Sequence, residues 1–238
     1  MICFLTSRTD IDDAGVLDPS NGFIEELRNC FLENCRAVYV CSDPDGWDIM
    51  DKYTAYTFSS FVSSGFKFKN FIPIDGRNGE YAKVLIDNSD MVILGGGHVP
   101  TQNRFFQKIG LREILRDYKG IVIGISAGSM NSAETVYSQP ELEGEALDPD
   151  YEKYLPGLGL TDVNLLPHYQ ECKNDVLDGF RVYENITYPD SMGRTFYAIP
   201  DGSYLFIKDG KEELRGEAYM IRDGVLTQIS ENGGTFKL

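Results

Sequence analysis

The chain alternates between short apolar runs and amphipathic segments over its first two thirds. Short apolar runs predict strands, whereas apolar residues spaced by three and four predict helices. The predicted strands are Ile2–Ser7, Ala37–Cys41, Phe71–Ile74, Met91–Leu94 and Ile121–Ile125. The predicted helices are Gly22–Asn34, Trp47–Ser63, Tyr81–Asn88 and Phe105–Asp117. Such alternation is typical of a mostly parallel sheet with helices on both faces.

The pattern changes after Leu155. A helix is predicted near Asn174–Glu184. Further strands are predicted near Val163–Leu166, Tyr197–Ile199, Tyr204–Ile207, Ala218–Ile221 and Val225–Ile229. Asp-Gly pairs at 209–210 and 223–224 indicate antiparallel hairpins. We find no repeat or linker, and therefore predict an α/β fold with C-terminal antiparallel hairpins, formed by one domain over residues 1–238.

A Gly-x-Ser-x-Gly motif follows the strand predicted at Ile121–Ile125. It comprises Gly124, Ser126 and Gly128, and helix-compatible residues come after it. A sharp turn from strand to helix holds a nucleophile in a strained conformation, and the glycines avoid collisions with neighbouring backbone. The amide of Ala127 would then face a developing oxyanion. We predict that Ser126 is a nucleophile; a Ser/Gly turn that caps a helix is the alternative.

A serine nucleophile needs a base, and the chain contains two histidines, His98 and His168. Both follow predicted strands, and open α/β sheets place their sites at the carboxyl ends of strands. His168 comes after Ser126 in the chain, and we predict that it is the base, with His98 as the alternative.

A run of three glycines, Gly95 to Gly97, follows the strand Met91–Leu94. Glycines there let backbone amides approach a ligand, so Gly97 is a candidate for a second oxyanion donor beside Ala127. The same turn could bind a phosphate, but it lacks both the Gly-x-Gly-x-x-Gly pattern and the P-loop lysine.

Charge and cysteine content narrow the class of partner. The net charge of −15 argues against nucleic acid and anionic membranes. Five cysteines without a Cys-x-x-Cys pair fit a reducing compartment, and no apolar run has the length of a signal or membrane-spanning segment. We therefore expect a cytoplasmic protein. We expect no metal, cofactor, nucleic acid or membrane partner, and a homodimer is left open.

The Gly-Gly-Gly turn, the Gly-x-Ser-Ala-Gly motif and the segment Pro167-His168-Tyr169 occur in an order that resembles the aspartyl dipeptidase (peptidase E) and cyanophycinase family of serine peptidases. The resemblance extends to Phe4-Leu5-Thr6-Ser7 and Ile199-Pro200-Asp201-Gly202. It implies a flavodoxin-like sheet related to class I glutamine amidotransferases. It also implies that Ser126 is the nucleophile, His168 the base, and the amides of Gly97 and Ala127 the oxyanion hole.

The resemblance also implies an acidic residue between the nucleophile and the histidine. Glu141, Glu143 and Glu145 are the nearest candidates. Asp148, Asp150 and Asp162 are further ones, and a solvated acidic surface is the alternative reading of all of them. We select Glu141 as the third catalytic residue, followed by Glu143.

Substrate contacts are predicted at three further residues. In aspartyl dipeptidases, which this chain resembles, an arginine that follows the histidine in the sequence holds the aspartate side chain of the substrate. The resemblance therefore suggests Arg181 for this role here. His98 and Gln102 lie near the glycine turn, although Gln102 could equally cap the helix that follows.

These features favour a serine peptidase that hydrolyses a short peptide or isopeptide, such as an Asp-X dipeptide, through an acyl-enzyme. An esterase of the α/β-hydrolase type is the first alternative. The 42 residues between Ser126 and His168 leave little room for the β/α units that it normally has there. The second alternative is a binding module without catalytic activity, in which Ser126 only forms hydrogen bonds with a ligand.

Overall fold

The central feature of the computed structural model, which describes residues 1–11 and 14–238, is a mixed sheet. Within these residues, eight strands follow the order β16-β13-β12-β1-β5-β4-β2-β3. The parallel strands are β1 (Ile2–Thr6), β2 (Cys35–Val40), β3 (Phe68–Ile74), β4 (Met91–Leu94) and β5 (Ile121–Ile125). The antiparallel strands are β12 (Tyr204–Lys208), β13 (Lys211–Arg215) and β16 (Thr235–Lys237). The prediction of a mostly parallel sheet is confirmed.

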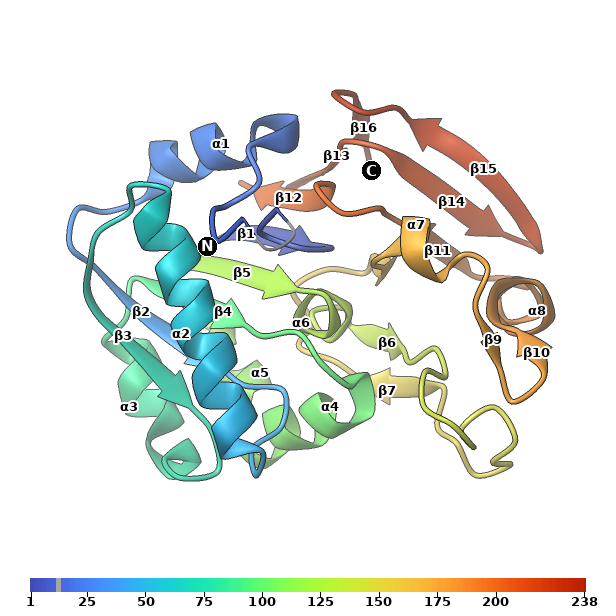
Figure 1. Cartoon of the computed structure of the whole chain (residues 1–238), viewed down its shortest axis with the longest axis horizontal. Coiled ribbons are helices and arrows are strands. Elements are labelled where there is room, and N and C mark those ends of the chain that lie inside the picture. The colour runs from blue at the N-terminus through green and yellow to red at the C-terminus, as the bar shows by residue number, and fades with distance from the viewer. Residues whose placement is uncertain (12–13) are drawn as a thin grey trace.

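Helices flank this sheet, and Figure 1 shows α2 crossing the face toward the viewer. They are α1 (Phe23–Cys30), α2 (Trp47–Ser63), α3 (Ala82–Asp87), α4 (Val99–Lys108) and α5 (Leu111–Arg116), with short 3₁₀ turns at Ser20–Gly22 and Gly79–Tyr81. The single helix predicted at Phe105–Asp117 is wrong. Gly110 adopts a φ of 65°, which ends α4 and redirects the chain into α5.

The core is centred on β4 and β5. Every side chain of β4 is buried, and so are the first four residues of β5. A parallel sheet covered on both faces requires this kind of continuous apolar strand rather than an alternating one. The core therefore explains why these strands are apolar runs in the sequence.

A second sheet of order β15-β14-β11-β8 lies on the opposite side of the molecule from α2 (Figure 1). Its strands are β8 (Asn164–Leu166), β11 (Thr195–Ala198), β14 (Ala218–Arg222) and β15 (Val225–Ser230). Strands β8 and β11 are parallel to each other, whereas the other pairs are antiparallel. The remaining elements on this side are β6 (Thr135–Tyr137), β7 (Tyr154–Pro156), α6 (Ala127–Met130), α7 (Tyr169–Cys172) and α8 (Tyr188–Asp190).

Asp-Gly turns close the C-terminal hairpins β12–β13 and β14–β15, as predicted. In both turns the Asp and the Gly have positive φ, which a two-residue hairpin of this type requires. The helix predicted at Asn174–Glu184 is wrong for the same reason. Asp178 and Gly179 have φ of 53° and 86°, and they join strands β9 (Val176–Leu177) and β10 (Phe180–Arg181). A short π-helix, Val182–Thr187, follows.

The two sheets meet at the carboxyl ends of four strands. In the first sheet β1 and β5 are neighbours, and in the second β8 and β11 are neighbours. Residues that directly follow these strands are therefore brought together. Among the described residues, no helix combines the length and the apolar character needed to cross a membrane.

The contact between α6 and β4 leaves no space for a side chain at Gly128. A Cβ added there would lie 2.3 Å from the main-chain oxygen of Leu94. We expect Gly128→Ala to lower the free energy of unfolding by about 3 kcal/mol, because the backbone must shift to relieve the overlap. Urea denaturation measures this effect.

Gly144→Ala is the control, since a Cβ at Gly144 meets no atom within 4 Å. Its φ of 93° should still cost about 1 kcal/mol. An equal loss in the two variants would contradict the packing argument.

Candidate active site

Ser126 occupies the sharp turn between β5 and α6. Its φ of 51° and ψ of −113° are unusual for a residue other than glycine. The amide of Ser126 donates a hydrogen bond to the main-chain oxygen of Thr6 (3.1 Å), and the Ser129 hydroxyl donates to the same oxygen (2.7 Å). The end of β1 therefore holds the turn from below and fixes the position of the Ser126 hydroxyl.

His168 follows β8 and has a left-handed backbone conformation, with a φ of 57°. Its Nε2 atom lies 2.9 Å from Ser126 Oγ, within hydrogen-bond distance. Its main-chain amide donates to the hydroxyl of Ser7 (2.8 Å), the residue that follows β1. The structure thus brings together Ser126 and His168, the pair that the sequence analysis selected.

The carboxylate that contacts His168 is Asp201, which follows β11. Asp201 Oδ1 lies 2.8 Å from His168 Nδ1, on the side of the ring away from Ser126. The prediction that Glu141 fills this position is wrong, and so are the alternatives Glu143 and Glu145. The reason is the parallel pairing of β8 with β11, which places the residues after both strands side by side.

Hydrogen bonds determine the charge state of Asp201. The Ser7 hydroxyl donates to Asp201 Oδ1 (2.6 Å), and the main-chain amide of Asp201 donates to Gln170 Oε1 (3.0 Å). Burial raises the pKa of Asp201, but the hydrogen bonds that its carboxylate accepts from His168 and Ser7 lower it, and the pKa ends below its ordinary value. Asp201 is therefore a carboxylate at neutral pH.

His168, Asp201 and Glu171 are also the one set of residues in the described part of the chain that could hold a metal ion. Their ligand atoms lie within 4.8 Å of one another. His168 Nδ1 and Asp201 Oδ1 already share a hydrogen bond, and a metal bound through these two atoms would have to replace it. The arrangement as it stands suits proton transfer between Ser126 and His168.

The glycine turn after β4 lies directly against Ser126. A Cβ added at Gly96 would lie 3.4 Å from Ser126 Cβ, and one at Gly97 would lie 2.3 Å from Ser42 Oγ. Gly97 has a φ of 148°, which also favours glycine. The turn therefore lies in van der Waals contact with Ser126 at Gly96, and at Gly97 the packing against Ser42 leaves no room for a side chain.

A model of peptidase family S51 matches residues 4–215, which includes every residue of this site. The chain belongs to peptidase family S51. It is therefore a peptidase of the serine hydrolase class. The family resemblance that the sequence analysis reported is confirmed.

One solved structure that is similar to this S51 peptidase is the crystal structure of a protein provisionally named peptidase E, from Listeria monocytogenes EGD-e. The TM-score is 0.61 at 14% sequence identity, and the alignment covers 96% of this chain and 98% of that chain. At this identity the similarity shows the fold alone. The chain has no match among curated proteins.

In this S51 peptidase, Gln102 supports the glycine turn from inside the protein. Its side chain is fully buried. Its Nε2 donates to the main-chain oxygen of Gly95 (2.6 Å), and its Oε1 accepts a hydrogen bond from Asn131 (3.0 Å). The prediction that Gln102 binds substrate is wrong, because both ends of its amide are used inside the protein.

His98 and the segment after Pro140 form a second polar cluster beside the glycine turn. His98 Nε2 lies 2.8 Å from Glu145 Oε1, and His98 Nδ1 lies 2.8 Å from Thr101 Oγ1. The main-chain amide of Val99 donates to Glu141 Oε1 (3.3 Å). Both ring nitrogens of His98 are therefore engaged with protein atoms, and its contact with substrate stays a prediction.

Arg181 lies in β10, in the hairpin that follows α7. Its side chain is 68% exposed, its Nη1 donates to Glu184 Oε1 (3.2 Å), and its main-chain amide donates to Asn185 Oδ1. These contacts stay within its own segment, and a role in binding the substrate's aspartate stays a prediction.

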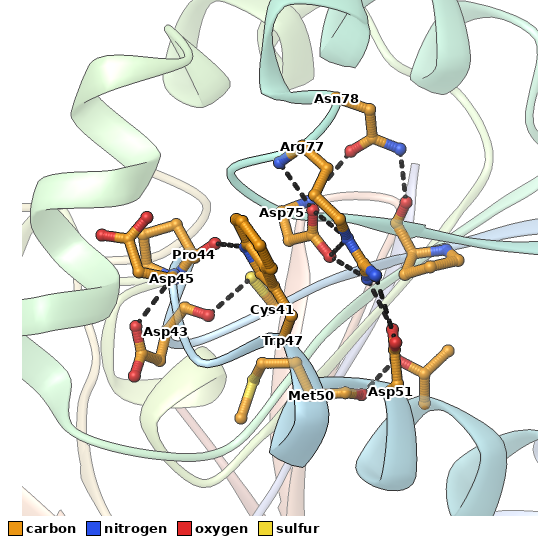
Figure 2. Close-up of polar contacts among 12 residues, drawn as sticks. Cys41, Asp43, Pro44, Asp45, Trp47, Met50, Asp51, Asp75, Arg77 and Asn78 are labelled. Carbon is orange, nitrogen blue, oxygen red and sulfur yellow. Dashed lines mark hydrogen bonds and ion pairs between the residues drawn. The ribbon is translucent and has the colours of Figure 1, made fainter.

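Figure 2 shows a polar cluster at the carboxyl ends of β2 and β3. The guanidinium of Arg77 lies between the carboxylates of Asp75 and Asp51, and 5.9 Å from the ring centroid of Trp47. Asp75 is buried, so this ion pair holds the loop after β3 against the start of α2. Ser42, which packs against Gly97 of the glycine turn, lies between Cys41 and Asp43 of this cluster in the chain.

The lowered pKa of Asp201 makes folding stability depend on pH. A carboxyl whose folded pKa lies below its ordinary value, 3.8, stabilises the fold fully above that value. This contribution is lost as the pH falls through the lower folded value. The gap in unfolding free energy between the wild type and Asp201→Asn should therefore shrink as the pH falls from about 7 to about 3. Urea denaturation across this range tests the expectation, and a constant gap would contradict it.

Proposed function

We propose that this S51 peptidase hydrolyses a short peptide or isopeptide through an acyl-enzyme formed on Ser126. The observation that supports the proposal most directly is the continuous relay of contacts from Ser126 through His168 to Asp201, at 2.9 and 2.8 Å. Nucleophile, base and orienting acid in this geometry form a catalytic triad. In this proposal the turn at Ser126 is a nucleophile elbow.

In the first step, Ser126 Oγ attacks the carbonyl carbon of the scissile bond, and His168 Nε2 accepts the hydroxyl proton. The carbonyl oxygen becomes an oxyanion. The main-chain amides of Gly97 and Ala127 are the proposed donors to it, because no described protein atom accepts a hydrogen bond from either. The same amides would bind the neutral carbonyl more weakly, so they favour the transition state.

In the second step, His168 returns the proton to the leaving nitrogen, and the amine departs from the acyl-enzyme. Water then attacks the ester carbonyl and gives its proton to His168, and Ser126 Oγ leaves with that proton. Asp201 accepts the hydrogen bond from His168 Nδ1 throughout. It fixes the tautomer that leaves Nε2 free to act as the base and stabilises the imidazolium.

The finer substrate assignment, an Asp-X dipeptide or a related isopeptide, is part of this proposal. A panel of Asp-X dipeptides beside β-aspartyl isopeptides tests it directly. Cytoplasmic localisation is also part of the proposal, and the five free cysteines of the chain support it.

Ser126→Ala should lower kcat by on the order of 10³-fold or more, because only the oxyanion donors and substrate binding would remain. His168→Ala should be nearly as damaging. The double variant should be no worse than either single one, because the pair acts as a unit. Steady-state kinetics and a circular dichroism spectrum of each variant provide the test, and activity within a few-fold of wild type in a folded Ser126→Ala protein would contradict the mechanism.

Asp201→Asn should lower kcat by about 10²- to 10⁴-fold with little change in KM, because the amide favours the wrong tautomer of His168. Labelling by a fluorophosphonate gives a readout that does not depend on the substrate. The probe should react with Ser126 in the wild type and much more slowly in Asp201→Asn. Glu143→Gln, which removes an exposed carboxylate outside the triad, is the control and should label at the wild-type rate. An Asp201→Asn protein that labels at the wild-type rate would exclude Asp201 from the triad.

A further inference from the structure

The hydroxyl group of Ser7 lies among the contacts that hold His168 in place. The Ser7 side chain is fully buried. Its Oγ accepts a hydrogen bond from the main-chain amide of His168 (2.8 Å) and donates its proton to Asp201 Oδ1 (2.6 Å). An amide can only donate and a carboxylate can only accept, so the hydroxyl hydrogen has to point toward Asp201. The direction of this hydrogen bond is therefore fixed by the two partners.

Three hydrogen bonds close a ring that begins and ends on His168. The main-chain amide of His168 donates to Ser7, and Ser7 donates to Asp201 Oδ1. His168 Nδ1 lies 2.8 Å from the same Oδ1 and has to be the donor there, because the carboxylate only accepts. The imidazole is thus held to its own backbone through two points. Nε2 is left as the acceptor that faces Ser126 Oγ at 2.9 Å.

One oxygen, Asp201 Oδ1, accepts both of the side-chain hydrogen bonds of this ring. Each donor draws on the negative charge of that oxygen, so the Ser7 hydroxyl reduces the charge that the carboxylate presents to the imidazole. The hydrogen bonds from His168 and Ser7 both lower the pKa of Asp201. A carboxylate that has lost the Ser7 donor would stabilise the imidazolium form of His168 more strongly.

The other titratable groups on the elements around this ring contribute equally to the wild type and to a Ser7 variant. They are Glu171, Glu141, Cys172, Arg8 and Asp10. Burial raises the pKa of the Cys172 thiol to about 12, so this group is uncharged at neutral pH. Arg8 Nε lies 3.6 Å from Asp10 Oδ1, and this pair is already present in the wild type. A titration difference between the wild type and a Ser7 variant therefore reports on the Ser7 hydroxyl.

We propose that Ser7 is a positioning residue of the site, whose hydroxyl holds the imidazole of His168 in place and moderates the charge of Asp201. This proposal rests on the proposed function, since the direction and strength of the base matter for catalysis only if Ser126 is the nucleophile. A fixed direction of Nε2 favours proton transfer from Ser126. A moderated carboxylate keeps the imidazole unprotonated, and therefore active as a base, at lower pH. Both effects pass through the two residues that Ser7 contacts.

Ser7→Ala removes the hydroxyl, and the pH profile of fluorophosphonate labelling at Ser126 measures both effects. The probe carries no ionisable group, and its labelling rate is followed from about pH 5 to about pH 9. On the high-pH plateau, where His168 is neutral, the rate should fall about tenfold, because the imidazole is held at one point fewer. The acidic limb of the profile should move upward by about half a pH unit, because Asp201 has lost a donor.

Nuclear magnetic resonance gives a second readout that does not depend on activity. The chain has two histidines, so the imidazole of His168 gives one of two signals, and a His98→Gln protein assigns it. The pH at which the His168 signal has moved halfway should be about half a unit higher in Ser7→Ala than in the wild type.

Three further variants isolate the hydroxyl from the packing around it. Ser7→Thr retains the hydroxyl and should restore the wild-type midpoint and most of the plateau rate. Ser7→Cys fills the same place with a weak donor, and its midpoint should move in the same direction as that of Ser7→Ala. Ser132→Ala is the matched control, since the equally buried Ser132 hydroxyl donates to the main-chain oxygen of Gly128 (2.8 Å), outside the ring. It should leave the midpoint unchanged.

The outcomes separate this inference from the function on which it rests. An unchanged plateau or an unchanged midpoint in a folded Ser7→Ala protein would overturn the proposal, and so would a midpoint that moves to lower pH. A folded Ser7→Thr protein that behaves like Ser7→Ala would overturn it as well. If the probe fails to label wild-type Ser126, the proposed function fails, and the resonance titration still decides whether Ser7 acts on His168 through Asp201.

Discussion

The hydroxyl group of Ser7 joins the two sheets at the point where the site is assembled. Ser7 follows β1 of the first sheet, accepts the amide of His168 and donates to Asp201, both of which follow strands of the second sheet. The same end of β1 supports Ser126 through the main-chain oxygen of Thr6. One strand end therefore fixes the distance between Ser126 on one sheet and His168 and Asp201 on the other. Any slippage between the sheets would separate Ser126 from His168.

The sequence was sufficient to select Ser126 and His168, which the structure places in contact, because both choices depend on local context. Ser126 lies in a turn whose glycines are required by neighbouring backbone, and His168 is one of only two histidines. The acid could not be obtained in this way. Both Val163–Leu166 and Tyr197–Ile199 were predicted as strands, but nothing local in either segment shows that they pair in parallel. That pairing places Asp201 beside His168. In the sequence analysis Asp201 appears only within the segment Ile199-Pro200-Asp201-Gly202, as part of the family resemblance, and not as a candidate acid.

Other errors in the sequence analysis have local physical causes. The pair Asp178-Gly179 carries the same hairpin signal as the two C-terminal Asp-Gly pairs, and it joins β9 to β10 where the sequence analysis predicts a helix. Gln102 lies close to the glycine turn in sequence, but its side chain binds the main-chain oxygen of Gly95 from inside the protein. Sequence position does not reveal on which side of the backbone a side chain lies. Glu141 was selected as the third catalytic residue, but the carboxylate that contacts His168 is that of Asp201.

The backbone conformation of Ser126 has a consequence for how this protein can change. A residue with a Cβ at a φ of 51° carries a backbone cost of about 1–3 kcal/mol, which glycine would largely avoid. Selection for stability alone would thus favour glycine at this position, and selection for chemistry favours serine. The rest of the structure, above all the end of β1 beneath the turn, has to compensate for this backbone cost. Substitutions that strengthen the packing between β1 and β5 would therefore offset the cost of keeping a serine at position 126.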